Sequence, residues 1–353
     1  MLGDKVSKII YEVIFNGCKL LLTFSFLYNV KLSQPTYFQS YVFSMGVVGF
    51  LSPFVNYYAI FKSKNTRSYL SIINTQIKYA LILSLLFSIF FIRSVIPAIL
   101  FIGLISAAVR SEQALVYNNK KNLFNLSSAL IYLFFAIYYC LSKDSRFYLI
   151  LSGQLLVDIL GYFMVTKILT KKRKKIHFKF NSKISIFNLL SGMPSLGLSY
   201  ISSLNFDTSF IFTIVDKCRS VILLSGEIIS NVEKHSRFNF IQNTFIYLIF
   251  VCAISIYCLV YSIIERQGFI VVPICLISFI AYTKVFNHIR FNSNTRVLFN
   301  YQILHFIFYT LVGLLMWADK FWVYLILLQP LISALIYLSV NKSLQLKSKY
   351  INI

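Results

Sequence analysis

Polar side chains at helical spacing interrupt the first apolar stretch of the chain. Glu12, Asn16, Lys19 and Thr23 follow one another at intervals of three or four residues, so a helix would place them on one face. Lys19 lies near the middle of this stretch, where a charge inside a bilayer needs either a counter-charge or a water-filled cavity. Two interpretations therefore stay open: Lys19 neutralises Glu12, or it binds an anion.

Charged residues also occur in two later apolar stretches. Asp158 stands near the centre of one, with Gln154 one helical turn away. A carboxylate there can bind a proton or cation, or it can take part in a buried hydrogen bond with a neighbouring helix. Asp216 lies close to Lys217 and Arg219 in another stretch, where they can form a local ion pair or leave a cation for a ligand.

A stripe of small polar residues marks one more apolar stretch. Its members share one helical face, namely Asn188, Ser191, Ser195, Ser199 and Ser202, with Gly192, Pro194 and Gly197 among them. Such a stripe is typical of a seam between packed helices, and it can also line a polar cavity.

The elements that must position these residues are long apolar helices. Of the 353 residues, 58% are hydrophobic and only 13% are charged, whereas a soluble domain carries about 25% charged residues. The sequence predicts an all-α polytopic membrane protein with about 12 transmembrane helices. The expected spans are about 9–30, 38–61, 77–92, 95–117, 122–142, 147–169, 185–206, 209–232, 244–263, 268–285, 301–317 and 321–340.

The 34 Lys and Arg residues predict how these helices are oriented. We assign 25 of them to one side of the membrane, six to the opposite side and three to positions within the spans. By the positive-inside rule the basic side is cytoplasmic and holds both termini. The longest basic gap, 171–183, divides the chain into 1–175 and 176–353, each with six spans. Topology and contact with anionic lipid headgroups explain the charge of +23 better than nucleic acid does.

Several kinds of chemistry are missing from the pattern. The six cysteines lie inside or at the ends of apolar stretches without a CxxC pair, so we expect no metal site and no disulfide framework. We find no HExxH motif, no glycine-rich phosphate loop and no histidine before His177. The predicted outer connections are short, whereas a polysaccharide polymerase or glycosyltransferase would need a sizeable outer loop with catalytic residues. We therefore expect a protein that is not an enzyme and has no cofactor.

The chain resembles the multidrug/oligosaccharidyl-lipid/polysaccharide exporter superfamily, and in particular its Wzx-type polysaccharide flippases. Two stretches carry the resemblance together with the span count, cytoplasmic ends and central basic gap. From Asn188 to Asp207, a Gly-x-Pro at Gly192 and an Asp at the outer end resemble the seventh span of the family. The stretch 222–237 resembles its eighth.

The resemblance implies two six-helix bundles around a central cavity that opens alternately to each side. Such flippases move an oligosaccharide on undecaprenyl pyrophosphate from the cytoplasmic to the periplasmic leaflet of the bacterial inner membrane, for O-antigen and other surface polysaccharides. It implies substrate-binding roles for Lys19, Asn16, Arg219 and Lys217. Asp158 and Glu12 would then couple transport to H+ or Na+.

Other functions stay open beside the flippase. A drug/cation antiporter of the same superfamily would favour acidic cavity residues over basic ones, and a polymerase would need the outer loop. The expected partners are the lipid-linked oligosaccharide, membrane lipids and other proteins of polysaccharide assembly.

Overall fold

The computed structural model describes residues 2–55, 69–89, 95–116, 121–168, 182–235, 295–336 and 338–339. These residues are almost entirely helical, and no β-strand occurs among them. The chain divides into two compact units, Met1–Phe210 (unit 1) and Ile211–Ile353 (unit 2). The part of the chain that the structure describes is therefore all-α, as the sequence predicts.

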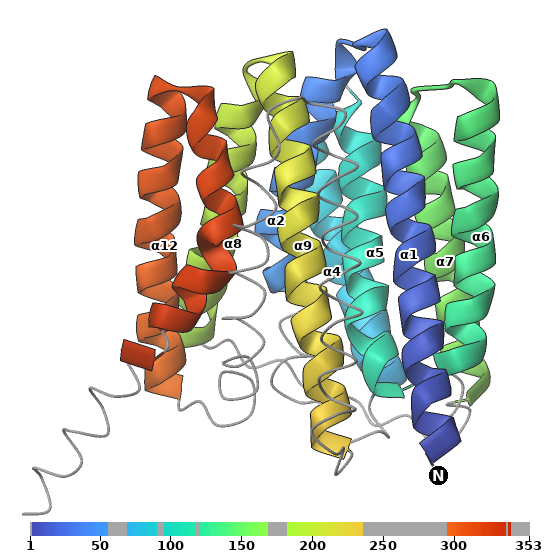
Figure 1. Cartoon of the computed structure of the whole chain (residues 1–353). Coiled ribbons are helices and arrows are strands. Elements are labelled where there is room, and N and C mark those ends of the chain that lie inside the picture. Colours follow the sequence, from blue (N-terminus) through green and yellow to red (C-terminus); the bar gives the residue numbers. More distant parts are fainter. Residues whose placement is uncertain are drawn as a thin grey trace, which may run out of the picture. The chain divides into compact units, whose positions relative to one another are not determined.

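Most of the described helices belong to unit 1 (Figure 1). They are α1 (Leu2–Ser33), α2 (Tyr37–Val55), α4 (Tyr69–Ser88), α5 (Ile96–Val116), α6 (Lys121–Ser142), α7 (Phe147–Ile168) and α8 (Ser182–Ser203). Helix α9 (Phe206–His235) begins in unit 1 and continues into unit 2. Unit 2 also contains α12 (Thr295–Ala318) and the 3-10 helix η4 (Lys320–Leu328), which continues as an α-helix over 329–336.

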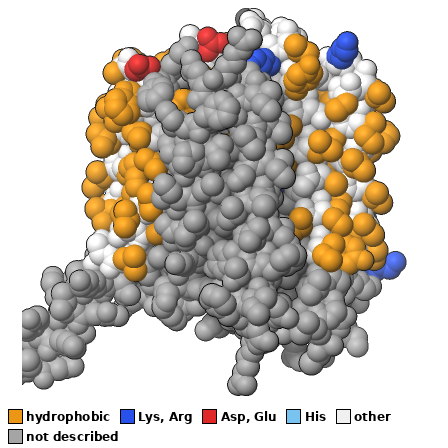
Figure 2. Space-filling view, viewed as in Figure 1, with side chains coloured by type: hydrophobic (Ala, Val, Ile, Leu, Met, Phe, Trp, Pro, Cys, Tyr) orange, Lys and Arg blue, Asp and Glu red, His pale blue; other side chains and the backbone are white. Residues whose placement is uncertain are grey.

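Among the residues that the structure describes, four helices are long and apolar enough to cross a membrane: Ile10–Ser33, Tyr37–Val55, Asn122–Ser142 and Phe147–Met164. Large apolar side chains stay on their outer surface, with Phe134 67% and Leu141 79% exposed. Figure 2 shows hydrophobic side chains over the flank formed by α1, α6 and α7, with Lys and Arg near its ends. Exposing this much apolar surface to water is unfavourable in free energy, whereas contact with lipid chains avoids that cost. These helices are therefore compatible with a membrane protein.

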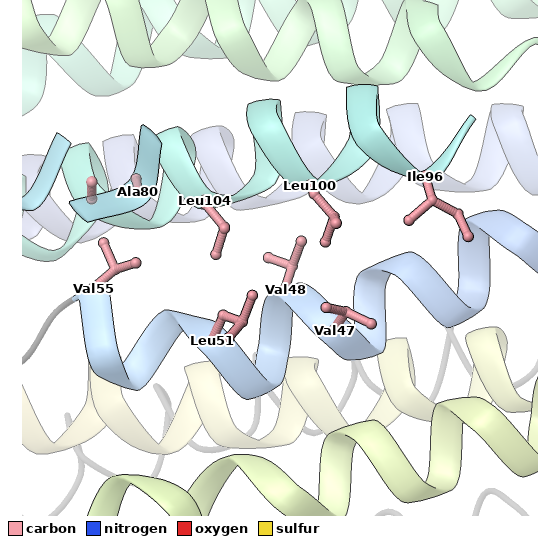
Figure 3. Packing of buried hydrophobic residues seen from close by; sticks show 9 residues of the cluster. Val47, Val48, Leu51, Val55, Ala80, Ile96, Leu100 and Leu104 are labelled. Atoms are coloured by element: carbon pink, nitrogen blue, oxygen red, sulfur yellow. The ribbon is translucent and has the colours of Figure 1, made fainter. Parts of the chain in front are cut away.

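Helix α2 lies at the centre of the packing in unit 1. Its residues Val47, Val48, Leu51 and Val55 face α4 and α5, and Figure 3 shows them opposite Ala80, Ile96, Leu100 and Leu104. On another side α2 packs along α8, while α1 packs along α6. The first helix after the long basic gap therefore belongs to unit 1 by its packing. The predicted division into 1–175 and 176–353 stays a prediction.

The observed helices overlap the predicted spans, but α1 begins at Leu2 instead of near 9, α12 begins at Thr295 instead of near 301, and two further elements also differ. Helix α4 begins at Tyr69 instead of near 77, and its first turns contain Asn74, which accepts a hydrogen bond of 3.1 Å from Tyr162 of α7. The last span begins as a 3-10 helix, which fits Pro330, since proline cannot donate the α-helical bond to residue 326. The spans 244–263 and 268–285 lie outside the described residues.

Three short connections meet at one end of unit 1. They join α1 to α2, α6 to α7 and α8 to α9, and the charge pattern assigns all three to the non-cytoplasmic side. The amide of Asn29 donates to the carbonyls of Tyr139 (2.8 Å) and Asp144 (2.7 Å), which ties the α1 end to the α6–α7 connection. The ring of Phe38 in α2 packs against Phe206 of α9 at a centroid distance of 5.8 Å. Hydrogen bonds and aromatic contacts thus hold these helix ends together.

Candidate functional site

The predicted face of α1 is half-buried in the structure. Glu12, Asn16 and Lys19 all have intermediate exposure, while Val13 and Leu21 on the rest of the helix are exposed. The Asn16 side chain donates to the Glu12 carbonyl at 2.8 Å, and the Thr23 hydroxyl donates to the Lys19 carbonyl at 3.0 Å. The helix therefore places these residues on one face, and part of their polar capacity is used within the helix.

Asp158 lies at the centre of a hydrogen-bond chain in unit 1. Its side chain is 1% exposed, and it accepts a 3.1 Å bond from the Gln154 amide one turn away in α7. Gln154 in turn accepts a 2.9 Å bond from the hydroxyl of Tyr132 in α6. The Tyr132 ring contacts Phe15 of α1 at a centroid distance of 5.7 Å. This bond of the carboxyl group lies within α7 and reaches α6 only through Gln154, so both interpretations of Asp158 stay open.

The predicted cation of α9 bridges two helices of unit 2. Arg219 forms an ion pair with Asp216 at 2.5 Å, and it donates a 2.7 Å hydrogen bond to the hydroxyl of Tyr309 in α12. The side chains of Arg219 and Asp216 are 23% and 29% exposed, so the pair is only partly removed from solvent. Among the residues that the structure describes, none accepts a hydrogen bond from the buried Nε of Arg219. Lys217, next to Asp216, is half-buried.

Further polar groups of unit 2 continue from this ion pair. His305 of α12 lies 2.6 Å from the Ser333 hydroxyl through its Nε2, and Gln329 donates to the same hydroxyl at 2.8 Å. The His305 ring also packs against the Tyr309 ring at a centroid distance of 5.9 Å. We call this set the unit 2 polar cluster; it consists of Asp216, Arg219, His305, Tyr309, Gln329 and Ser333.

Four members of the unit 2 polar cluster were not predicted from the sequence. His305 and Tyr309 stand one helical turn apart in an apolar stretch, as do Gln329 and Ser333. Polar pairs at a spacing of four in two successive apolar stretches were the available signal. The contact between those stretches was not predictable from spacing alone.

The serine stripe of α8 forms a seam with α2. A Cβ atom on Gly46 would lie 2.3 Å from Ser199 Cβ, and one on Gly192 would lie 2.6 Å from the Phe50 carbonyl oxygen. Ser199 is 4% exposed. The observed contacts therefore match helix packing, one of the two interpretations of this stripe, along its described part.

An exposed ion pair in the α6–α7 connection contrasts with the one in α9. The Arg146 side chain pairs with Asp144, and its Nε donates to the carboxylate at 2.6 Å. This hydrogen bond lowers the pKa of Asp144 and raises that of Arg146. Both groups therefore stay charged at neutral pH, and the ion pair encloses no site.

Within the described ranges, no group of three or more His, Cys, Asp and Glu side chains could hold a metal ion. Cys18, Cys140 and Cys218 are free thiols. The chemistry that these residues offer is accordingly that of charge and hydrogen bonding, at Lys19 and Asp158 in unit 1 and at the unit 2 polar cluster.

Comparison with protein-family models, curated proteins and solved structures gives no match. The described residues therefore define a helical protein in which four helices are suited to a membrane, and one of these helices contains the buried carboxyl group of Asp158.

Proposed function

We propose that the chain is a flippase that moves a lipid-linked oligosaccharide from the cytoplasmic to the periplasmic leaflet of a bacterial inner membrane. In this proposal about twelve helices form two six-helix bundles, and a central cavity opens alternately to each side. The sugar and pyrophosphate cannot cross hydrocarbon unaided, because unsatisfied polar groups and charges are very costly there. A polar cavity would shelter this head while the isoprenoid tail stays in the bilayer.

The partly buried guanidinium of Arg219 is the observation that carries the proposal. Placing an arginine at the centre of a membrane helix costs about 2.5–3.5 kcal/mol on insertion scales, so a cation among apolar helices usually has a function. Asp216 and Tyr309 accept hydrogen bonds from two of its nitrogens, and among the described residues none accepts one from its buried Nε. A guanidinium with donors in a fixed plane suits phosphate oxygens. Lys19, Asn16 and Lys217 are the further candidates for the anionic head.

The short connections favour transport over polymerisation. The described links between helices at the predicted outer side comprise 34–36, 143–146 and 204–205, together with residue 319. None of these can hold a catalytic domain. In the proposed flippase, Asp158 and Glu12 would couple transport to H+ or Na+.

A drug/cation antiporter is the second candidate, and Asp158 is the observation that favours it. A carboxyl group that is 1% exposed among apolar helices can bind a cation or exchange a proton for one. The two candidates differ in the cargo charge that they require. An anionic cargo depends on Arg219, and a cationic cargo depends on Asp158.

Arg219 can be tested against a matched arginine. Cells that lack the gene should build lipid-linked repeat units but retain them on the cytoplasmic leaflet. We expect wild-type protein and Arg146→Gln to restore outward transfer, because Arg146 has the same type of partner but lies in an exposed connection. Arg219→Gln, at equal protein level in the membrane, should reduce transfer about tenfold or more, which corresponds to about 1.4 kcal/mol of binding free energy. Normal transfer by Arg219→Gln would remove the role of Arg219 in binding the anionic head, and normal transfer in cells that lack the gene would contradict the flippase itself.

A further inference from the structure

The unit 2 polar cluster joins a histidine to the candidate anion site through buried hydrogen bonds and a ring contact. His305 is 5% exposed, Ser333 is fully buried and Gln329 is 7% exposed. The Tyr309 side chain contacts both ends of the cluster: its hydroxyl accepts from Arg219, and its ring packs against His305. A change of charge at Arg219 will therefore alter the electrostatic energy of a charge at His305, and the reverse also holds.

The hydrogen bonds of Ser333 define the protonation state of His305. The Ser333 oxygen accepts from the Gln329 amide, so we assign its own hydrogen to His305 Nε2. Nε2 is then an acceptor and the imidazole is neutral. Burial of the ring favours this neutral form, and the positive charge of Arg219 beyond Tyr309 favours it further, since two like charges would repel at low dielectric constant.

The cluster also has a second arrangement that suits a protonated His305. Among the described residues, no group donates a hydrogen bond to the buried Oε1 of Gln329. If the Gln329 amide turns over, Oε1 can accept from the Ser333 hydroxyl. The Ser333 oxygen can then accept a hydrogen bond from a protonated Nε2. The same three side chains thus satisfy either form of the imidazole, and only the direction of the hydrogen bonds changes.

We propose that His305 is a proton-binding site that takes up a proton when a pyrophosphate anion binds at Arg219. This inference rests on the proposed function, because it takes Arg219 as the anion site. The charged groups described around His305 are Arg219 and Asp216 of α9, with Tyr309 of α12 as the titratable neighbour, while Gln329 and Ser333 on the last helix are neutral. An anion at Arg219 offsets its positive charge, so imidazolium becomes more favourable. By reciprocity, protonation of His305 strengthens anion binding by the same factor.

The sign of this linkage has a consequence for transport. The proton and the anionic head bind together at the cluster, so this site does not exchange one for the other. An exchanged ion would have to bind elsewhere, and Asp158 and Glu12 of unit 1 are the candidates.

The test measures binding by the full-length protein in lipid nanodiscs. The probe is a short-chain isoprenyl pyrophosphoryl sugar, in which both phosphates are substituted, so its own charge stays constant between about pH 5.5 and 8, where histidine titrates. We expect the wild-type Kd to fall as the pH falls, by up to about tenfold per pH unit, with uptake of up to about one proton per probe bound. Calorimetry in two buffers with different ionisation enthalpies measures that uptake directly.

His305→Gln should bind the probe without proton uptake, at the weak affinity that the wild type shows at alkaline pH. Ser333→Ala provides a second variant, and it should shift the pH dependence while binding persists. His235→Gln, at the end of α9, is the matched control and should keep the wild-type pH dependence. Binding by the wild type that does not vary with pH, or proton uptake that survives in His305→Gln, would overturn the inference alone. If the wild type binds no probe at any pH, or Arg219→Gln binds it normally, the anion site itself is wrong and the inference falls with it.

Discussion

At the scale of residues, the described part of the chain contains two arginine–aspartate pairs whose surroundings differ. Arg146 and Asp144 are 55% and 10% exposed in a connection, whereas Arg219 and Asp216 are 23% and 29% exposed and Arg219 is also bonded to Tyr309 of another helix. Exposed pairs contribute little to stability because water screens them. A partly buried pair that reaches a second helix is maintained against a desolvation cost, which is why we place function at Arg219.

Lys19 can be tested by a variant that removes its charge and a variant that removes its suspected partner as well. If it binds the anionic head, Lys19→Ala should reduce outward transfer about tenfold or more, the equivalent of about 1.4 kcal/mol. Lys19→Arg should retain part of the activity because it preserves the charge. The control is Lys31→Ala at the end of the same helix, where the ammonium lies over the Phe210 ring at 5.7 Å.

The double variant Glu12→Gln with Lys19→Met separates the two interpretations of Lys19. Surface polysaccharide is measured at equal amounts of protein in the membrane. If the double variant makes as much surface polysaccharide as the wild type, Lys19 only balances the charge of Glu12. That result would exclude a role of Lys19 in substrate binding.

Local spacing made some of these residues predictable. The Asp216–Arg219 pair follows from a separation of three positions on a helix. Tyr309 as the partner of Arg219, and Ser333 as the partner of His305, could not be predicted. Spacing within one helix does not indicate which turn of another helix lies beside it. Asp158 was predictable as an unusual buried carboxyl, but its link to Tyr132 through Gln154 needed the packing of α6 on α7.

At the scale of elements, the seam between α2 and α8 depends on glycine. A Cβ atom on Gly192 would meet backbone atoms of Phe50, at 2.6 Å from its oxygen and 2.9 Å from its Cα, so α2 itself would have to move. Gly197 on the same helix has no atom within 4 Å of the corresponding position. The two glycines therefore provide a matched pair in one helix.

We expect Gly192→Ala to lower the free energy of unfolding by about 1–3 kcal/mol, the usual range for overpacking. Gly197→Ala should leave stability unchanged or raise it by up to about 1 kcal/mol, because alanine is the better helix former. Thermal unfolding of the two purified variants in the same detergent checks this. Equal melting temperatures for both variants would mean that α2 and α8 do not pack this closely.

Helix positions were largely predictable because apolar length and flanking polar residues define them. The start of α4 at Tyr69 was missed because its first turns contain polar residues such as Asn74, whose contact with Tyr162 of α7 depends on the fold and not on an apolar run. The 3-10 start of the last span could have been predicted from Pro330, which disfavours a continuous α-helix before it.

At the scale of the whole molecule, composition and charge predicted a helical protein suited to a membrane, and the described residues agree. The all-α class and four helices of membrane-crossing length are observed. The number of twelve spans and the two bundles stay predictions, because two expected spans lie outside the described residues. The cargo is also a prediction, since charge distribution indicates an anionic partner but does not identify it.

Outward transfer by the purified protein tests the central claim most directly. The full chain is reconstituted into liposomes with a fluorescently labelled undecaprenyl pyrophosphate oligosaccharide, and a membrane-impermeant quencher reports the fraction of head groups in the outer leaflet. We predict that wild-type protein moves the lipid between leaflets at a rate well above that of protein-free liposomes. Arg219→Gln should lower this rate about tenfold or more, in line with a loss of about 1.4 kcal/mol. A wild-type rate equal to that of empty liposomes would contradict the account.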